Sequence, residues 1–356
     1  MKILLFIDHL SGFGGAQRVI VNVANKMNSK GNEVIFVLTG NSSKCVYPLD
    51  SNVKILLVQE ENSEGVSRIK KIKKIRQIVK KMNPDVVISF LTMVNIMTIL
   101  STIGTRVPVI ISERNDPVQC SKTEKCLSKV FYRFSDCVVV QTKDIKNKIS
   151  SFYKKRIDII ENPLVDHNYE KTDYSITKKV VAVGRLNKQK NYYLLLNAFR
   201  EVLKEYPDYK LDIYGTGDEL EALQQKCMKE GLSNSVCFKG NEKNIIEKET
   251  RYDFYVMSSD FEGMPNALAE ALSVGLPCIS TNCDGGGAAA LICNNKNGVL
   301  VPKGDVGAMT NAMKAYIVDP SFAKRMGENA KEVRKSLSHT NIMYKWETLI
   351  EEISKV

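Results

Sequence analysis

Short apolar runs alternate with amphipathic stretches along almost the whole chain, and this alternation constrains the fold more than any other feature. The pattern is typical of parallel sheets covered by helices on both faces. We predict two series of strands. They occupy residues 2–7, 33–38, 53–58, 85–90, 108–113, 137–142 and 157–161, and then 179–184, 210–215, 236–240, 254–259, 277–281 and 298–301. The sequence therefore predicts an α/β protein with two doubly wound domains.

The gap between the two series marks the domain boundary. Few apolar residues occur over 166–179, so we expect the interdomain linker there. A chain of 356 residues also exceeds the size of most single domains. We predict a first domain over 1–170, a second over 171–335, and a C-terminal helix over 336–356 that returns to the first.

Charge is distributed unevenly between the halves. Residues 1–170 carry 26 Lys and Arg against 16 Asp and Glu, a net charge of +10, and residues 171–356 carry 25 against 24, a net of +1. An anionic lipid, a nucleic acid or a phosphorylated substrate would therefore meet the first half. The single Trp and a basic stretch without interleaved aromatics offer no stacking platform, so we expect no nucleic-acid partner.

Several classes of protein are disfavoured by what the sequence lacks. No apolar stretch approaches the roughly 20 residues that a membrane span needs, and the start lacks the basic region of a secretory signal. Nine scattered cysteines, never spaced C-x-x-C, argue against a disulfide framework or a zinc site. We expect a cytoplasmic protein whose thiols are reduced and buried.

A glycine-rich turn follows the first predicted strand. Gly14 and Gly15 stand where a helical pattern begins near Ala16. Glycines at such a junction let backbone N–H groups approach a phosphate, and the helix N-terminus favours negative charge. A tight turn without a ligand explains the same residues.

The first strand of the second series runs into a cluster of cations. Arg185 and Lys190 follow its carboxyl end, where sheets of this kind bind ligands. An Arg fork and a mobile Lys can clamp a diphosphate and stabilise it as a leaving group. The alternative is a solvated loop.

Two carboxylates follow the predicted strand 254–259. Pro265 is well placed as the first helical residue, which leaves Glu262 in the loop and Glu270 on the helix. Pro265 and Glu270 are separated by a rise of roughly 7.5 Å. The pair can therefore reach opposite ends of a nucleotide-diphospho-sugar, with Glu262 at the sugar and Glu270 at the ribose. The alternative is a helix cap and a surface residue.

These motifs and their order resemble the retaining glycosyltransferase family 4, over nearly the whole chain. The resemblance is carried by the glycine turn, the Arg185 and Lys190 loop, the pair Glu262 and Glu270, and three further segments. Those segments are Tyr214-Gly215-Thr216-Gly217-Asp218, Gly275-Leu276-Pro277 and Asn297-Gly298-Val299-Leu300-Val301-Pro302. The family has the GT-B fold, in which two Rossmann-like domains face a central cleft and C-terminal helices pack back on the first domain.

The resemblance also implies roles for individual residues. Glu262, Arg185 and Lys190 would be catalytic, with Glu262 on the donor-sugar hydroxyls and the two cations on the diphosphate. Glu270 would bind the ribose, and Gly14 and Gly15 would lie under the phosphates. The other implied donor-binding residues are Gly184, Gly215, Gly217, Gly263, Met264, Pro265 and Asn266. Transfer in the family is metal-independent and retains the anomeric configuration, and no Asp-x-Asp occurs in this chain to hold a metal ion.

The chain departs from the family in two loops. Arg114 stands where many relatives have His, so Glu113, Arg114 and Asn115 are candidates for orienting the donor sugar or the acceptor, against a plain structural loop. The usual Gly-Pro-x-Glu-Ile is replaced by a segment containing Gly285, Gly286 and Gly287. Such variants are similar to bacterial transferases that use UDP-hexoses or UDP-N-acetylhexosamines.

A basic amphipathic stretch over 68–81 indicates where the acceptor is. Apolar residues at 69, 72, 75, 79 and 82 form a helical stripe among eight cations. Such helices favour anionic membranes, although a helix covering a sheet needs the same stripe for its own core. We expect peripheral attachment to the inner face of the membrane and a glycan acceptor on polyprenyl diphosphate. This acceptor belongs to the assembly of capsule, lipopolysaccharide or glycoprotein glycans.

Other functions remain open on the sequence alone. A GT-B-fold enzyme of another kind, such as a nucleotide-sugar epimerase or a glucan synthase, shares the fold. Glu262 and Glu270 disfavour the epimerase, and glucan synthases are usually longer. A catalytically silent scaffold would differ by neither transferring nor hydrolysing any UDP-sugar.

Overall fold

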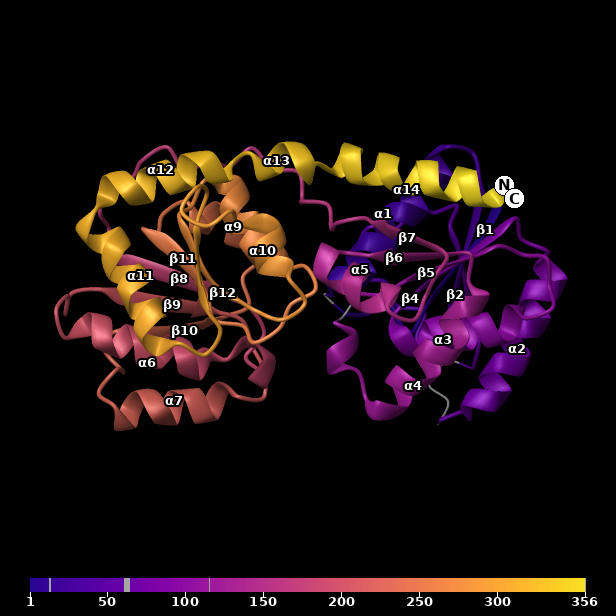
Figure 1. Cartoon of the computed structure of the whole chain (residues 1–356), viewed down its shortest axis with the longest axis horizontal. Coiled ribbons are helices and arrows are strands. Elements are labelled where there is room, and N and C mark those ends of the chain that lie inside the picture. Colours follow the sequence, from indigo (N-terminus) through magenta and orange to yellow (C-terminus); the bar gives the residue numbers. More distant parts are fainter. Residues whose placement is uncertain (13, 61–64, 115, 356) are drawn as a thin grey trace. The chain divides into compact units, whose positions relative to one another are not determined.

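The computed structural model describes residues 1–12, 14–60, 65–114 and 116–355. The chain forms two compact units. Unit 1 comprises residues 1–163 and 339–356, and unit 2 comprises residues 164–338. Each unit is a parallel sheet with helices packed on it (Figure 1), as the alternation of apolar runs predicts.

Unit 1 contains a seven-stranded sheet in the order β3-β2-β1-β4-β5-β6-β7. All its strand pairs are parallel. The strands are β1 (Lys2–Ile7), β2 (Glu33–Leu38), β3 (Lys54–Leu57), β4 (Val86–Phe90), β5 (Val109–Ser112), β6 (Cys137–Val140) and β7 (Arg156–Ile159). The helices are α1 (Gly15–Ser29), α2 (Arg68–Met82), α3 (Thr92–Thr102), η1 (Pro117–Gln119), α4 (Lys122–Phe131), η2 (Tyr132–Phe134), α5 (Lys143–Ser150) and α14 (His339–Ser354). The strand order reverses beside β1, which is where sheets of this type bind ligands.

Unit 2 contains a six-stranded sheet in the order β10-β9-β8-β11-β12-β13, also parallel. The strands are β8 (Lys179–Val183), β9 (Lys210–Tyr214), β10 (Val236–Gly240), β11 (Phe254–Met257), β12 (Cys278–Asn282) and β13 (Val299–Pro302). The helices are η3 (Lys188–Lys190), α6 (Tyr192–Leu203), α7 (Leu220–Lys229), α8 (Ile245–Glu249), α9 (Asn266–Val274), α10 (Gly287–Leu291), α11 (Val306–Val318), α12 (Pro320–Ala330) and α13 (Val333–Ser336). The order reverses between β8 and β11.

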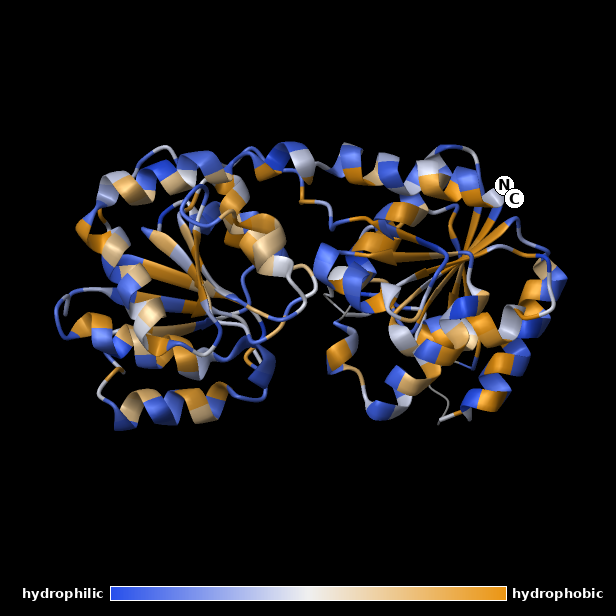
Figure 2. Ribbon diagram, in the orientation of Figure 1, coloured by the Kyte–Doolittle hydropathy of each residue, from blue (hydrophilic) through white to orange (hydrophobic). Residues whose placement is uncertain are grey.

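Every predicted strand is present, with its ends displaced by no more than two residues. The central strands are buried on both faces, so they are largely apolar, whereas helices such as α2 and α5 bury apolar residues on one side (Figure 2). The prediction of buried cysteines is wrong in part. All nine thiols are free, but Cys126, Cys237 and Cys293 are exposed.

The segment 164–178, which we call the strap, connects β7 to β8 without a helix or strand of its own. It is hydrogen-bonded to unit 2: the Lys171 N–H donates to the Val274 carbonyl at 2.6 Å, and the Tyr174 hydroxyl donates to the Gly275 carbonyl at 2.9 Å. The boundary between the units therefore precedes the strap, whereas we expected it within the strap, at 170/171. Polar composition alone does not reveal such backbone anchoring.

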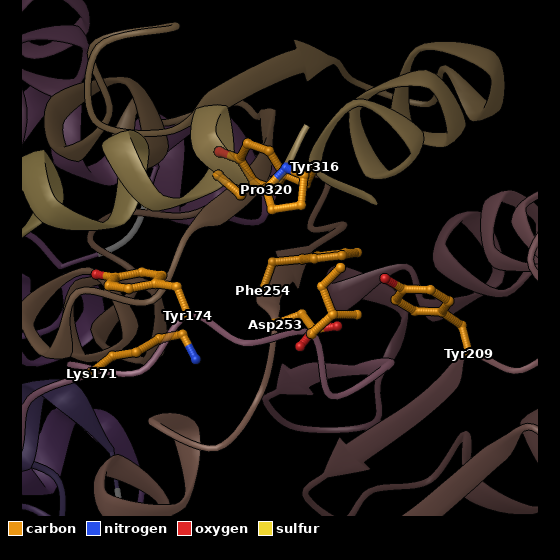
Figure 3. Close-up of a pocket in the computed structure, with 9 residues that line it drawn as sticks. Lys171, Tyr174, Tyr209, Asp253, Phe254, Tyr316 and Pro320 are labelled. Atoms are coloured by element: carbon orange, nitrogen blue, oxygen red, sulfur yellow. The ribbon is translucent and has the colours of Figure 1, made fainter. Parts of the chain in front are cut away.

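A small pocket lies under the strap, at the edge of the sheet where β9 and β11 begin. Figure 3 shows Lys171 and Tyr174 from the strap on one side, with Asp253 and Phe254 at the start of β11. Because parallel strands bind ligands at their carboxyl ends, this aromatic pocket is at the opposite edge from the predicted donor site.

The C-terminal helix α14 belongs to unit 1, in line with the predicted return to the first domain. Its Trp346 is fully buried and stacks on Phe90 of β4, with ring centroids 5.6 Å apart. Its Glu347 pairs with Lys26 and Lys30 of α1 at 3.1 and 2.7 Å. Unit 1 is thus completed by residues that follow unit 2 in the chain.

Candidate active site

The loops after β8, β11 and β12 are joined by hydrogen bonds at the carboxyl edge of unit 2. The Asp260 N–H donates to the Gln189 carbonyl at 2.9 Å, and the Asn191 amide donates to the Asp260 carboxylate at 2.9 Å. The Glu262 N–H donates to the Asp284 carbonyl at 2.8 Å. Loops from three neighbouring strands therefore hold one another in place, which gives the side chains on them a fixed frame.

Lys190 and Glu262 meet in this frame. The Lys190 amine donates to Oε1 of Glu262 at 2.7 Å, and the Ser259 hydroxyl donates to the same oxygen at 2.9 Å. The other oxygen of Glu262, Oε2, has no partner among the residues that the structure describes. One oxygen is thus held by the protein, and the other can accept a hydrogen bond from a ligand.

Arg185 follows β8 directly and is exposed. Within the described ranges it forms no ion pair with a carboxylate, in contrast to Lys190. A guanidinium without a protein partner can bind an anionic ligand without first breaking a salt bridge.

The three glycines predicted on the first two loops lie against one another. A Cβ at Gly215 would lie 2.0 Å from the Gly184 carbonyl oxygen, and one at Gly217 would lie 2.2 Å from the Leu186 carbonyl oxygen. At Gly184 a Cβ would lie 2.9 Å from the Lys190 side chain. These glycines therefore let two loops and the Lys190 side chain pack without intervening atoms.

The loop after β11 leads into α9. Pro265 is the N-cap residue, so the helix begins at Asn266, one residue later than predicted. No side chain caps this helix, and the N-terminal N–H groups of a helix attract anions. Gly263 and Met264 precede the cap, and a Cβ at Gly287 would lie 2.4 Å from the Gly263 carbonyl oxygen.

The altered glycine segment is explained by this packing. Gly285 and Gly286 have left-handed φ values of 86° and 70°, and Gly287 starts α10 in close contact with the loop before α9. Each of the three positions disfavours a side chain. The segment thus supports the Glu262 loop, although it lacks the Glu of the usual family sequence.

Glu270 lies one turn along α9 and is buried to the same degree as Glu262. Its neighbourhood includes His167 of the strap, whose ring contacts the Ser273 hydroxyl at 2.8 Å. Burial and the Arg334 charge lower the pKa of His167, so this ring is neutral at physiological pH. The strap thus packs against the same helix that carries Glu270.

In unit 1 the predicted glycine turn follows β1. Gly14 is the N-cap of α1, and Gly15 is its first residue. The Gly14 carbonyl accepts a hydrogen bond from the Tyr47 hydroxyl at 3.3 Å, and the first turn of α1 contains no acidic residue. The turn is therefore suited to an anion.

Glu113 follows β5 and is held by a buried network. Its oxygens accept hydrogen bonds from the Thr92 hydroxyl at 2.9 Å and from the Tyr132 hydroxyl at 2.6 Å. The Arg114 N–H donates to Oε1 at 3.1 Å. The Glu113 carboxylate therefore holds the corner after β5 in place and is not exposed to solvent.

Arg114 is buried beside this corner, at 6% exposure. Its guanidinium lies 4.6 Å from the ring centroid of Phe90 and 5.6 Å from that of Trp346, and it donates to Asn162 at 3.2 Å. Nε and the second terminal nitrogen have no partner among the described residues. Burial lowers the pKa of Arg114 to about 9, which leaves the side chain protonated at neutral pH. Asn115 is outside the described residues.

The structure thus brings Lys190, Glu262 and the glycines of unit 2 together, and separately brings Glu113 and Arg114 together in unit 1. Sequence reasoning missed the residues that hold them. They are Ser259, Asp260, Asn191 and Gln189 in unit 2, and Thr92, Tyr132, Asn162, Phe90 and Trp346 in unit 1. The polar residues just after β11 were a usable signal, but nothing local links Trp346 to Arg114.

Two family descriptions match the chain. "Glycosyltransferase Family 4" matches residues 13–167, and "Glycosyl transferases group 1" matches residues 170–333. Together they cover both units.

Relatives of full length are also transferases. The GalNAc-alpha-(1->4)-GalNAc-alpha-(1->3)-diNAcBac-PP-undecaprenol alpha-1,4-N-acetyl-D-galactosaminyltransferase of Campylobacter jejuni is 30% identical over 99% of this chain and 99% of the relative. The amylovoran biosynthesis glycosyltransferase AmsD of Erwinia amylovora is 26% identical over 98% of this chain and 99% of its own length.

Solved structures share the fold. Sucrose-phosphate synthase from Thermosynechococcus elongatus has a TM-score of 0.86 at 17% identity, covering 99% of this chain and 98% of that structure. Anabaena HepE in complex with UDP has a TM-score of 0.81 at 18% identity, covering 99% and 100%. With its two Rossmann-like units of GT-B type and a full-length relative at 30% identity, the chain belongs to glycosyltransferase family 4 and is a glycosyltransferase.

Proposed function

We propose that the enzyme transfers a hexose or N-acetylhexosamine from a UDP-sugar to a glycan on polyprenyl diphosphate. Transfer proceeds with retention and without a metal ion. The observation that carries the proposal is the arrangement at the carboxyl edge of unit 2, where Lys190 holds one oxygen of Glu262 and Arg185 stands without a carboxylate partner among the described residues. The Campylobacter relative, named for an undecaprenol-linked glycan acceptor, supports the acceptor class.

The donor is bound by charge at one end and by hydrogen bonds at the other. Arg185 and Lys190 bind the diphosphate, and the N-terminus of α9 adds further N–H donors. Oε2 of Glu262 accepts a hydrogen bond from a donor-sugar hydroxyl, while Lys190 and Ser259 fix the other oxygen. Glu270 accepts from the ribose hydroxyls. The pair therefore orients the anomeric carbon before reaction.

The chemical step exchanges one C–O bond for another. The anomeric carbon separates from the β-phosphate oxygen, and the acceptor hydroxyl oxygen attacks from the same face. The departing phosphate oxygen takes the hydroxyl proton, so no protein base is needed. Negative charge builds on UDP in the transition state, and Arg185 and Lys190 stabilise it there.

The proposed role of Arg185 and Lys190 also concerns whether transfer needs a metal ion. Among the described residues no group of three or more His, Cys, Asp and Glu side chains is placed to hold a metal ion. Metal independence is part of the proposal, and its support is the pair of protein cations at the diphosphate position. Loss of UDP release after treatment with a chelator would contradict it.

The acceptor binds to unit 1 at the cytoplasmic face of the membrane. Six cations of α2 are exposed and have no partner among the described residues: Arg68, Lys70, Lys73, Lys74, Lys80 and Lys81. Ile69, predicted to be on the buried stripe, is instead 69% exposed, whereas Ile75 and Val79 are buried. An exposed apolar residue among cations suits an anionic lipid surface.

A second exposed surface supports this attachment. Phe134 of η2 and Val130 of α4 are exposed, and they alternate with the exposed cations Lys129 and Arg133. Helix α3 packs against both α2 and α4 (Figure 1), so the three helices are neighbours within unit 1. No described helix is both long and apolar enough to cross a bilayer.

A donor screen tests the proposed function. The purified chain is incubated with a panel of UDP-, GDP- and ADP-sugars, with and without a polyprenyl-diphosphate glycan, and nucleotide release is followed. We expect release from one UDP-sugar that the acceptor stimulates. Release that ignores the acceptor, or a preference for GDP- or ADP-sugars, would contradict the proposal.

A further inference from the structure

Glu249 is a buried acid that no motif singles out. It ends α8 in unit 2 and is 1% exposed. Neither of its carboxyl oxygens has a hydrogen-bond partner among the described residues. A buried polar group without a partner is costly, and an apolar residue of similar size would avoid that cost.

The charged neighbour that acts on Glu249 is another acid, Glu270. Helix α8 packs against α9, the helix that carries Glu270. Burial raises the pKa values of Tyr255 of β11 and Cys278 of β12, and the charge of Glu249 contributes to both shifts. The Tyr255 hydroxyl donates to the Val183 carbonyl at 3.3 Å, and the Cys278 thiol donates to the Leu276 carbonyl at 3.1 Å.

Lys171 of the strap is bonded to the residue that follows Glu249. Its amine donates to the Thr250 carbonyl at 3.2 Å and lies 5.3 Å from the ring centroid of Tyr174. Figure 3 shows the two strap side chains next to each other, facing the start of β11. Lys171 therefore serves the backbone after Glu249 and forms no ion pair with the acid itself among the described residues.

Two carboxyl groups that share a buried site cannot both ionise freely. Burial first, and then the charge of Glu270, raises the pKa of Glu249 well above its usual value. Burial of this kind favours the uncharged form of Glu249. Buried ionisable groups without a partner are concentrated at functional sites. They destabilise the fold, so a functional role is the usual reason for their presence.

We propose that Glu249 is a positioning residue for donor binding, which stays uncharged behind α9 so that Glu270 alone presents a carboxylate to the ribose. The proposal rests on the proposed role of Glu270. When Glu249 ionises, the second negative charge repels Glu270 within a buried site, and Glu270 loses its position at the ribose hydroxyls. Affinity for the nucleotide therefore falls as the pH rises through the ionisation of Glu249.

The same ionisation affects folding, with a sign that can be worked out. The pKa of Glu249 is higher in the folded chain than in the unfolded chain, so folding takes up a proton. The free energy of unfolding consequently falls as the pH rises above the usual value of 4.5, until the folded carboxyl ionises. A variant that cannot ionise at this position lacks that decline.

The test measures UDP binding by isothermal titration calorimetry, because UDP carries the ribose and its binding needs no turnover. Wild type, Glu249→Gln and Glu249→Leu are compared between about pH 7 and about pH 9.5, the range in which buried Glu residues have been found to titrate. Glu247→Gln is the matched control, since Glu247 is on the same helix but pairs with Arg251 at the surface. Thermal unfolding of each variant is recorded over the same range.

We expect the wild-type Kd for UDP to rise about tenfold over this range, and the Glu247→Gln profile to follow it, as one repelling charge near Glu270 predicts. Glu249→Gln and Glu249→Leu should change less than about twofold, with Glu249→Leu the most heat-stable of the variants. Superimposable Kd profiles for wild type and Glu249→Gln would overturn the proposal. A wild-type Kd that stays flat over this range, while the Glu249 variants differ from wild type in stability, would also overturn it, because the role would then be structural.

A further variant separates this inference from the proposed function. If Glu270→Gln weakens UDP binding but the Glu249 variants behave as wild type, the role of Glu270 stands and that of Glu249 is wrong. If Glu270→Gln leaves UDP affinity unchanged, the ribose assignment is wrong and the proposal for Glu249 is overturned with it.

Discussion

The two units share one architecture but carry very different charge. Unit 1 contains 28 Lys and Arg against 17 Asp and Glu, a net charge of +11, and unit 2 contains 23 against 23, a net of zero. Dividing the chain by structure instead of at residue 170 therefore assigns the entire net charge to unit 1. Long-range attraction of anions is therefore a property of unit 1, whereas the charges of unit 2 balance one another.

The candidate sites differ in the same way. In unit 2 Glu262 is buried and Lys190 partly so, but one oxygen of the Glu262 carboxylate has no partner among the described residues. In unit 1 Glu113 and Arg114 are buried, and Glu113 is occupied by protein donors. The sites therefore differ in what is held: among the described residues, one oxygen of Glu262 has no partner in unit 2, whereas in unit 1 the carboxylate is held and two nitrogens of Arg114 have no partner.

The largest effect should come from the unit 2 pair. We expect Lys190→Ala and Glu262→Ala each to lower kcat/KM by about 100- to 1,000-fold, because each removes charge or orientation at the diphosphate and the sugar. Circular dichroism should show both variants folded. Lys188→Ala, an exposed cation in the same short helix, is the control and should retain activity. Wild-type turnover in either site variant would break the site assignment.

The next effect concerns Arg114 and tests whether the unit 1 corner takes part in the reaction. Arg114→Leu should lower kcat/KM by about ten- to a hundredfold, the value of a hydrogen bond to a charged group. Folding should survive, since Gln141 still donates to Asn162 at 2.7 Å. Full activity in a folded Arg114→Leu enzyme would mean that the corner after β5 has only a structural role.

Membrane attachment should show a smaller effect. We expect Lys73→Ala combined with Lys74→Ala to weaken binding to phosphatidylglycerol vesicles about tenfold at low salt, at about 1 kcal/mol or less per cation. The matched control is Lys229→Ala with Lys243→Ala, which removes two exposed cations from unit 2. Co-sedimentation measures both. Equal losses in the two pairs would mean that the charge difference between the units does not direct attachment.

The smallest effect tests how α14 is docked in unit 1. The amines of Lys30 and Lys26 lower the pKa of Glu347, so its contribution to stability is present above its usual pKa and is lost as the pH falls through the lowered value. Glu347→Gln should lower the melting temperature of unit 1 by about a degree at neutral pH, because the pairs are near the surface. Hydrogen exchange should place the change in α1 and α14, with unit 2 unaffected.

The sequence predicts the fold well because the strands are periodic and buried, and this constraint is local. All thirteen strands follow from apolar runs such as those of β1 and β12. The proposed donor-binding residues Lys190 and Glu262 were predicted because each follows a strand end. The support for Arg114 was not, because Phe90, Asn162 and Trp346 come from three distant parts of the chain.

Glu249 is a second residue whose environment the sequence does not predict. In the sequence it is one acid among several in a short polar segment, 242–249, and nothing marks it as buried. Its burial depends on how α8 packs against α9. Likewise the strap has the composition of a linker but is anchored by backbone contacts to Val274 and Gly275, which composition does not encode.

The position of α14 in unit 1 has a consequence for synthesis on the ribosome. Unit 2 is continuous in sequence, so it can fold as soon as residues 164–338 have emerged. Unit 1 cannot, since Trp346 fills the space beside Phe90 and Arg114 only after residues 339–356 are made. During translation the first domain to emerge is therefore the last to be completed, and until then the buried face that awaits α14 is open to chaperones and proteases.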